Sequence, residues 1–151
     1  MKRFISIPVA PSVDTAIYAS GDLIGGKLTI PAPDTGKIVS VRLVDQAGQA
    51  SVIDLVLWSA DPSGTTFTDN AALDVADTDM VALIGVVPIA AADYDTFADN
   101  RVATVPNYNL VYGPLAKGQN GGYSMYGALV SRGTPTYAAA TDLILSIGIE
   151  Y

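Results

Sequence analysis

Near its C-terminus the chain reads Leu143-Ile144-Leu145-Ser146-Ile147-Gly148-Ile149-Glu150, the clearest period-two pattern in the sequence. The odd-numbered positions are all large aliphatic residues, whereas the even-numbered positions include serine, glycine and glutamate. Because successive side chains of a strand point to opposite faces, this alternation predicts a β-strand with one strongly apolar face.

Short apolar segments recur along the rest of the chain, separated by glycine, proline and aspartate. They predict strands at residues 22–30, 38–45, 51–60, 86–90, 108–115 and 123–131. This spacing is typical of an all-β protein, and we expect a jelly-roll-like antiparallel β-sandwich with one or two short helices. Residues 12–151 are expected to form a single β-sandwich domain, and residues 1–11 an N-terminal arm or first strand.

Two of these strands carry further detail. Gly25 and Gly26 lie inside the first of them and predict either a bulge or a close approach by another backbone there. Residues 38–45 and 51–60 are expected to pair as a β-hairpin across a loop of about five residues. Residues 51–60 are apolar on both faces, which predicts a central strand covered on both sides, with Trp58 in the core.

Short helices and loops are expected between the strands. One helical turn is possible at residues 69–73, and a second helix should begin at an N-cap on Asp77 and end before Gly85. The polar composition of residues 93–100 predicts a loop. The glycine-rich run at residues 117–122 predicts a hairpin turn rather than a phosphate-binding loop, since it lacks the lysine and hydroxyl residue that end such loops.

The chain of 151 residues contains no histidine and no cysteine. The commonest general base, the commonest metal ligand and the thiol nucleophile are therefore all missing. Half of the residues are hydrophobic and only 15% are charged, a composition that excludes disorder for most of the chain. The composition favours a protein that acts through its surface, and we expect neither enzyme activity nor a cofactor.

The charge of the chain is acidic and uneven. The formal net charge is −7, which argues against nucleic acid as a partner. Residues 43–100 contain ten aspartates and no lysine or arginine, so a strongly negative side is expected if this segment folds onto one side. Such a side could keep a crowded protein soluble, or it could dock electrostatically. No apolar run is long enough to span a membrane.

One tripeptide, Asp34-Thr35-Gly36, is that of the aspartic proteases. Those enzymes pair two aspartates that share a proton, and a small chain would supply one from each of two subunits. The flanking residues disagree with that family, because Pro31-Ala32-Pro33 precedes the motif and Lys37 follows it. The tripeptide is also ordinary turn chemistry, which we favour.

Clustered carboxylates offer two other chemistries. The pairs Asp77/Asp79 and Asp93/Asp95 could ligate calcium, although neither has the spacing of an EF-hand loop. Helix capping and solvation explain both pairs as well. A glycosidase would need two positioned carboxylates, but in a chain with fifteen acidic residues some pair is always close. We therefore assign no catalytic, cofactor-binding or metal-binding residue.

Aromatic and apolar residues give the remaining signal. Tyrosine provides contact area at low entropic cost and keeps a polar tip, which suits an interface, whereas the alternative is a core tyrosine with its hydroxyl at the rim. Exposed aromatics would also suit a sugar-binding module. The residues that we predict to form an interface are Phe4, Ile5, Ile7, Tyr18, Tyr123, Tyr126 and Tyr137.

Several stretches resemble a group of small virion proteins of tailed bacteriophages, in overall style and spacing rather than in a catalytic signature. They are residues 18–28 (YASGDLIGGKL), 41–45 (VRLVD) with Gly48, 57–62 (LWSADP) continuing to 67–71 (FTDNA), and 129–137 (LVSRGTPTY). The resemblance implies a decoration or cement protein that binds and stabilises the exterior of a phage capsid, and it transfers no catalytic residue.

Partners and location follow from the same resemblance. The expected partners are the major capsid protein and further copies of the chain, as a homodimer or homotrimer, with no nucleic acid and no membrane. The chain would be made in the cytoplasm of a bacterial host and located on the capsid exterior of the virion. The alternative is a carbohydrate- or receptor-binding module of a phage tail.

Overall fold

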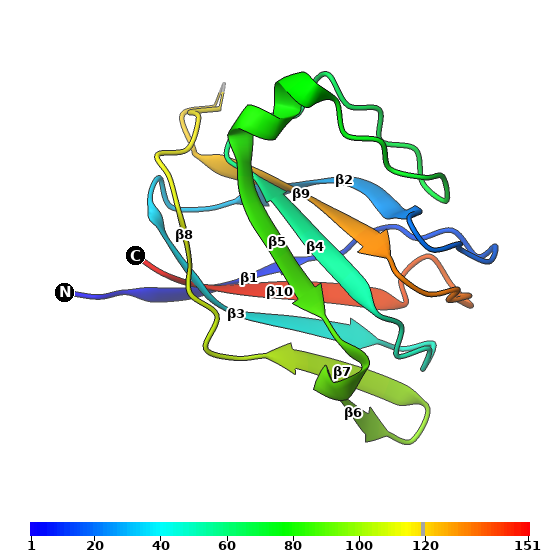
Figure 1. The fold of residues 1–151 in the computed structure, drawn as a ribbon. Helices are drawn as coiled ribbons and strands as arrows, with labels where there is room; N and C mark the ends of the chain where they lie inside the picture. Colours follow the sequence, from blue (N-terminus) through cyan, green and yellow to red (C-terminus); the bar gives the residue numbers. More distant parts are fainter. Residues whose placement is uncertain (119) are drawn as a thin grey trace.

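The computed structural model describes residues 1–118 and 120–151 and arranges them as two antiparallel sheets packed face to face (Figure 1). The first, which we call the six-stranded sheet, runs in the order β1 (Phe4–Val9), β10 (Leu143–Glu150), β3 (Gly36–Asp45), β7 (Asn100–Val105) and β6 (Tyr94–Phe97), with β8 (Leu110–Tyr112) also paired to β3. The four-stranded sheet runs in the order β2 (Leu23–Pro31), β9 (Ser124–Ser131), β4 (Ile53–Trp58) and β5 (Leu83–Ile89).

The connections make this sandwich a jelly roll. The chain crosses from one sheet to the other between β1 and β2, β2 and β3, β3 and β4, β5 and β6, β8 and β9, and β9 and β10, so that β1-β10-β3-β7 faces β2-β9-β4-β5. Two short 3-10 helices, η1 (Asp77–Ala82) and η2 (Ala91–Asp93), interrupt the strands. The all-β, jelly-roll-like fold with short helices is therefore confirmed.

Strand β10 occupies the interior of the six-stranded sheet, between β1 and β3. Its four odd-numbered residues, Leu143 to Ile149, are all fully buried against the four-stranded sheet. The period-two pattern predicted this strand correctly. Residues 1–11 were expected to form an arm or a first strand, and residues 4–9 among them pair with β10 as β1.

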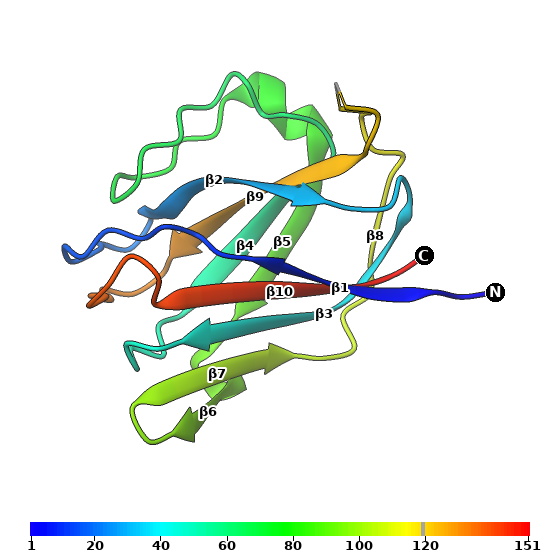
Figure 2. The same cartoon turned by 180° about the vertical axis from the view of Figure 1, so that it is seen from behind.

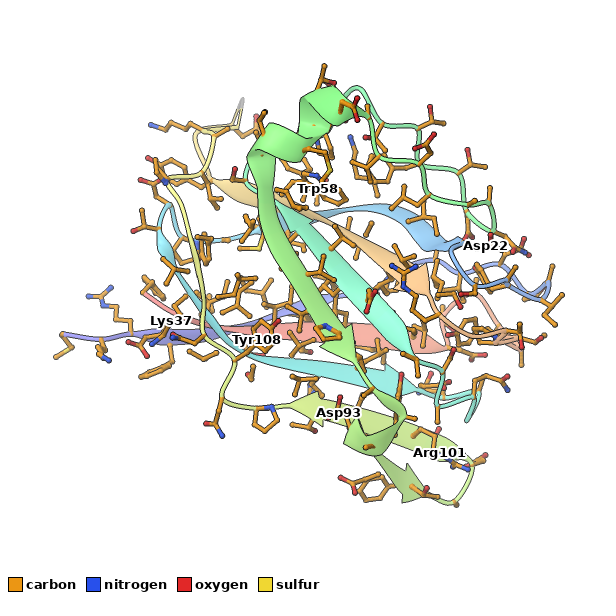
Figure 3. The ribbon with its side chains drawn as sticks, in the orientation of Figure 1. Asp22, Lys37, Trp58, Asp93, Arg101 and Tyr108 are labelled. Atoms are coloured by element: carbon orange, nitrogen blue, oxygen red, sulfur yellow. The ribbon has the colours of Figure 1, made fainter. Side chains whose placement is uncertain are left out.

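Strand β4 is central, as its two apolar faces predicted, with β9 on one side and β5 on the other. Its inward face joins the main core, whereas Val56 and Trp58 face outward into a second apolar cluster. Residues 59–82, which connect β4 to β5, lie over that cluster, and Figure 3 shows Trp58 beneath η1. Trp58 has no exposed surface, and its ring meets that of Phe67 edge to face at 5.9 Å between centroids.

The predicted hairpin of residues 38–45 and 51–60 is wrong, because β3 and β4 lie in different sheets. Asp45 ends β3 with its carboxylate buried, accepting backbone hydrogen bonds from Ala47 (3.0 Å) and Ala50 (2.8 Å). These bonds turn the chain out of the six-stranded sheet. Loop length alone does not distinguish a hairpin from a connection between sheets.

The polar segment at residues 93–100 is not a loop, as was predicted, but contains β6 and the start of β7. Phe97 pairs with Asn100 across a two-residue turn, in which Ala98 has a positive φ of 54°. The turn lacks the glycine that marks such hairpins. Because β6 is a short edge strand facing mostly water, it needs no apolar alternation.

The helix predictions were correct in part. Residues 77–82 are helical, but Ala76 is the N-cap and Leu83 and Ile84 already belong to β5. Residues 69–73 form no helix, because Asp22 and Ala72 pair there in an isolated bridge.

The segment predicted as a strand at residues 108–115 contains only the three-residue strand β8, which pairs with β3. Residues 117–122 therefore do not join two paired strands, although Lys117 and Tyr123 form a local bridge. Gln119, inside this predicted turn, lies outside the described residues.

The predicted bulge at Gly25 and Gly26 is present as a register shift between Ile24 and Leu28, and both glycines have φ of +76°. A Cβ on Gly25 would lie 2.8 Å from Cβ of Pro11, whereas nothing lies within 4 Å of a Cβ on Gly26. Both substitutions by alanine force an L-residue into the left-handed region, but only the first creates a clash.

We expect Gly25→Ala to lower the free energy of unfolding by about 2–4 kcal/mol and Gly26→Ala by about 1 kcal/mol. Urea denaturation of the two variants measures the difference, which isolates the contact with Pro11 because the backbone cost is shared. Equal losses in the two variants would show that the contact is easily relieved.

Candidate docking surface

Two of the carboxylates considered for catalysis or calcium binding, Asp34 and Asp79, accept hydrogen bonds from other parts of the fold. Asp34 Oδ1 accepts a hydrogen bond from the Leu115 amide at 3.0 Å. Asp79 accepts hydrogen bonds from the Thr65 hydroxyl (2.5 Å) and the Gly64 amide (3.3 Å). Within residues 1–118 and 120–151, no group of three acidic, histidine or cysteine side chains is placed to hold a metal ion.

Tyr18, Tyr137 and Ile7, predicted as interface residues, belong to the core instead, with exposed fractions of 1%, 1% and 8%. The two tyrosine rings meet edge to face at 5.8 Å, and the Tyr18 hydroxyl donates to Asp69 Oδ1 at 2.8 Å. Burial raises the pKa of both phenols above their ordinary range, and for Tyr18 the Asp69 carboxylate adds to the shift. The sequence signal for a surface tyrosine and a core tyrosine is the same.

The other four predicted residues reach the surface to different degrees. Tyr123 and Tyr126 are half-buried, and the Lys27 ammonium lies 5.7 Å from the Tyr126 ring centroid on the outer side of the four-stranded sheet. Phe4 and Ile5 on β1 are 67% and 42% exposed. They are adjacent on a strand whose outer edge is free, so Phe4 lies on the outer face of the six-stranded sheet and Ile5 on its inner face.

The outer faces of the two sheets differ in covering and in charge. Residues 59–82, which we call the acidic loop, cover the four-stranded sheet at the top of Figure 1. This loop contains no basic residue and five aspartates, Asp61, Asp69, Asp74, Asp77 and Asp79. Three further aspartates follow near β6, where Figure 3 places Asp93, so the acidic middle of the chain divides between two sites rather than forming one side.

The opposite face, the outer face of β1, β10, β3 and β7, is not covered. In Figure 2 the last three of these strands run side by side with no segment lying across them. We call it the bare face, and its residues are Phe4, Ser6, Pro8, Lys37, Ser40, Arg42, Val44, Val102, Thr104, Ile144, Ser146, Gly148 and Glu150. Its middle is lined by small residues, which leave a shallow hollow of about 270 Å³ beside Phe4 and Ser6.

The charge of the bare face is mildly basic. Glu150 is held between Lys2 at 2.7 Å and Lys37 at 3.3 Å, and the hydrogen bond from Lys2 is the main cause of its lowered pKa. Arg42, which is exposed, donates to the Ser146 hydroxyl at 3.2 Å. The even-numbered residues of β10 and the polar residues of β3 were visible in the sequence, but only the sheet order brings them together.

The chain matches no protein-family model and no curated protein sequence. None of the helices among the described residues has the length and hydropathy that a membrane span requires.

Proposed function

We propose that this protein is a structural virion protein that binds the exterior of a bacteriophage capsid and stabilises it as a decoration or cement protein. The observation that carries the proposal is the difference between the two outer faces: one lies under an acidic loop, and the other is bare and mildly basic. The resemblance of the sequence to small phage virion proteins supports the same role.

The geometry suits adhesion to a repeating surface. A sheet backed by a buried core is rigid, so little conformational entropy is lost when its face docks. We assign the bare face to the major capsid protein and the acidic loop to solvent, where its charge opposes aggregation. Contacts that are individually weak become strong together when one protein bridges several capsid subunits.

Charge reversal at Arg42 tests this assignment. We expect Arg42→Glu to weaken binding to expanded capsids about tenfold, because it places a negative charge in the middle of the docking face. Lys117→Glu changes the net charge equally but lies in the turn before β9, so it should bind as the natural chain does. Co-sedimentation with capsids of the phage that encodes the chain measures both affinities.

The outcomes separate the roles that the sequence left open. Capsid binding that is weakened in Arg42→Glu but not in Lys117→Glu supports the assignment of the bare face to the capsid. Failure of the natural chain to bind capsids, together with a specific saccharide on a glycan array, would replace the proposal by a carbohydrate-binding role in a phage tail. Binding that both charge reversals weaken equally would contradict the assignment of the bare face.

A further inference from the structure

Strand β1 presents unpaired backbone groups along one edge of the six-stranded sheet. Arg3 and Tyr151 exchange both backbone hydrogen bonds at 2.9 Å, and the register continues without a shift to Val9. In an antiparallel pair these mutual bonds recur at every second residue, so Ile5, Ile7 and Val9 bond to β10. The amide and carbonyl groups of Phe4 and Ser6 therefore point away from the sheet.

Pro8 restricts this edge. It occupies the next outward-pointing position and has no amide hydrogen, so no strand can receive a hydrogen bond there. Proline at such a position is a common protection of sheet edges against unwanted pairing. The complete pairing positions within β1 are Phe4 and Ser6, with Ile5 midway between them.

The edge of β1 is also open toward the interior of the sandwich. A hollow of about 420 Å³ lies between β1 and the end of β2, and its lining includes Ile5, Ile7, Pro33 and Tyr123. The edge strand β5 differs, because the Tyr108 hydroxyl donates to its Val86 carbonyl at 3.0 Å (Figure 3). An added strand beside β1 would place its inward side chains over apolar surface.

We propose that β1 pairs antiparallel with β1 of a second copy of this chain, with the two Ile5 residues facing each other across a two-fold axis. Phe4 then exchanges both backbone hydrogen bonds with Ser6 of the second copy, and Ser6 with its Phe4. The two six-stranded sheets become one continuous sheet through the dimer, a form of strand addition.

The backbone selects this register among the alternatives. A two-fold centred on Ser6 places Pro8 opposite Phe4, which leaves the Phe4 carbonyl without a donor. A two-fold centred on Phe4 requires Lys2, which precedes the strand, to pair with Ser6. Only the register centred on Ile5 gives the amides and the carbonyls of both Phe4 and Ser6 partners inside β1. This self-complementarity favours a second copy over an unrelated partner.

The side chains fit the same register on both faces. Ser6, Gly148 and Ser40 occupy one row across β1, β10 and β3, and a Cβ on Gly148 would collide with the Ser40 hydroxyl. Phe4 of the second copy lies at the open end of this row of small residues, beside the 270 Å³ hollow. On the inner face the two Ile5 side chains meet beside the apolar hollow. The dimer does not depend on the proposed capsid role.

Sedimentation velocity of three chains tests the pairing. The natural chain should sediment as a dimer, and Ser6→Pro as a monomer, because the substitution removes an outward amide but no bond to β10. Ser6→Ala keeps that amide and should remain a dimer. The melting temperature confirms that Ser6→Pro is folded, and a folded Ser6→Pro that still dimerises overturns the proposal, as does a natural chain that remains monomeric to millimolar concentration.

Single cysteines test the register in a chain that has none of its own. Directly opposed residues between hydrogen-bonded pairs have Cα atoms about 4.5 Å apart, within reach of a disulfide. Ile5→Cys should therefore form a covalent dimer under mild oxidation, whereas Phe97→Cys, which is more exposed and lies on the opposite edge strand β6, should not. An Ile5→Cys variant that stays uncrosslinked, or that crosslinks no faster than Phe97→Cys, contradicts this register.

Discussion

Replacing Trp58 by alanine is expected to lower the free energy of unfolding by about 4 kcal/mol, the loss typical of a large aromatic side chain removed from a core. Trp58 has no exposed surface and fills the second apolar cluster between the four-stranded sheet and the acidic loop. Without its ring, Phe67 loses its edge-to-face partner at 5.9 Å. We expect the loop to become accessible to proteases as well.

Trp58→Phe is the matched control. Within the described residues Trp58 Nε1 is buried without a hydrogen-bond partner, so phenylalanine removes an unsatisfied donor together with part of the ring. We expect this variant to lose only about 1 kcal/mol. Trp58 is the only tryptophan, so both variants lack tryptophan fluorescence. Urea denaturation of both is therefore followed by circular dichroism. A Trp58→Ala variant as stable as Trp58→Phe would show that the cluster contributes little.

Raising the pH above 10 is expected to unfold the protein steeply. Tyr18, Tyr112 and Tyr137 are at most 4% exposed, and burial raises the pKa of Tyr112 to about 12 and those of the other two further. The unfolded chain releases these protons near pH 10, whereas the folded chain retains them. The stability is therefore complete below pH 10 and falls as the pH rises toward the folded-state pKa values.

Tyr94 behaves alike, because burial raises its pKa too. The expected slope is about 1.4 kcal/mol per pH unit for each of these tyrosines, so that four of them remove a typical folding free energy within about two pH units. Denaturation curves between pH 8 and 12, together with tyrosinate absorbance, measure the slope.

The Tyr112→Phe/Tyr137→Phe double variant isolates the cause. Among the described residues neither hydroxyl has a hydrogen-bond partner, so the stability of the variant at pH 7 should be unchanged or higher. Tyr18 and Tyr94 remain, so its alkaline slope should fall to about one half. An unaltered slope in this variant would rule out the buried phenols as its source.

Sequence patterning predicted the strands that are buried on a defined face. β10 and β4 are correct because burial on one or both sides leaves a readable alternation or a continuous apolar run. The hairpin of β6 and β7 was missed because an edge strand in water carries no such pattern. The prediction that β3 pairs with β4 was wrong because the chain turns out of the six-stranded sheet at Asp45, where hydrogen bonds to its carboxylate fix the turn.

The candidate surface was predictable only in part. Phe4 and Ile5 are exposed, as an interface requires. Tyr18 and Tyr137 are core residues, and a tyrosine in the sequence does not indicate whether its side chain is buried or exposed. The bare face joins residues of β1, β10 and β3, which are distant in sequence and become neighbours only through the jelly-roll order. The division of the acidic segment depends on the same topology, since the acidic loop covers the four-stranded sheet whereas β6 is an edge strand of the six-stranded sheet.

A cryo-EM reconstruction of the virion that carries this protein tests the central claim, that a bare sheet face docks on the capsid, most directly. We predict jelly-roll density outside the shell, with β10, β3 and β7 facing the capsid subunits and the acidic loop facing solvent. Density in which the acidic loop contacts the shell, or a shell whose exterior lacks the protein, would contradict it.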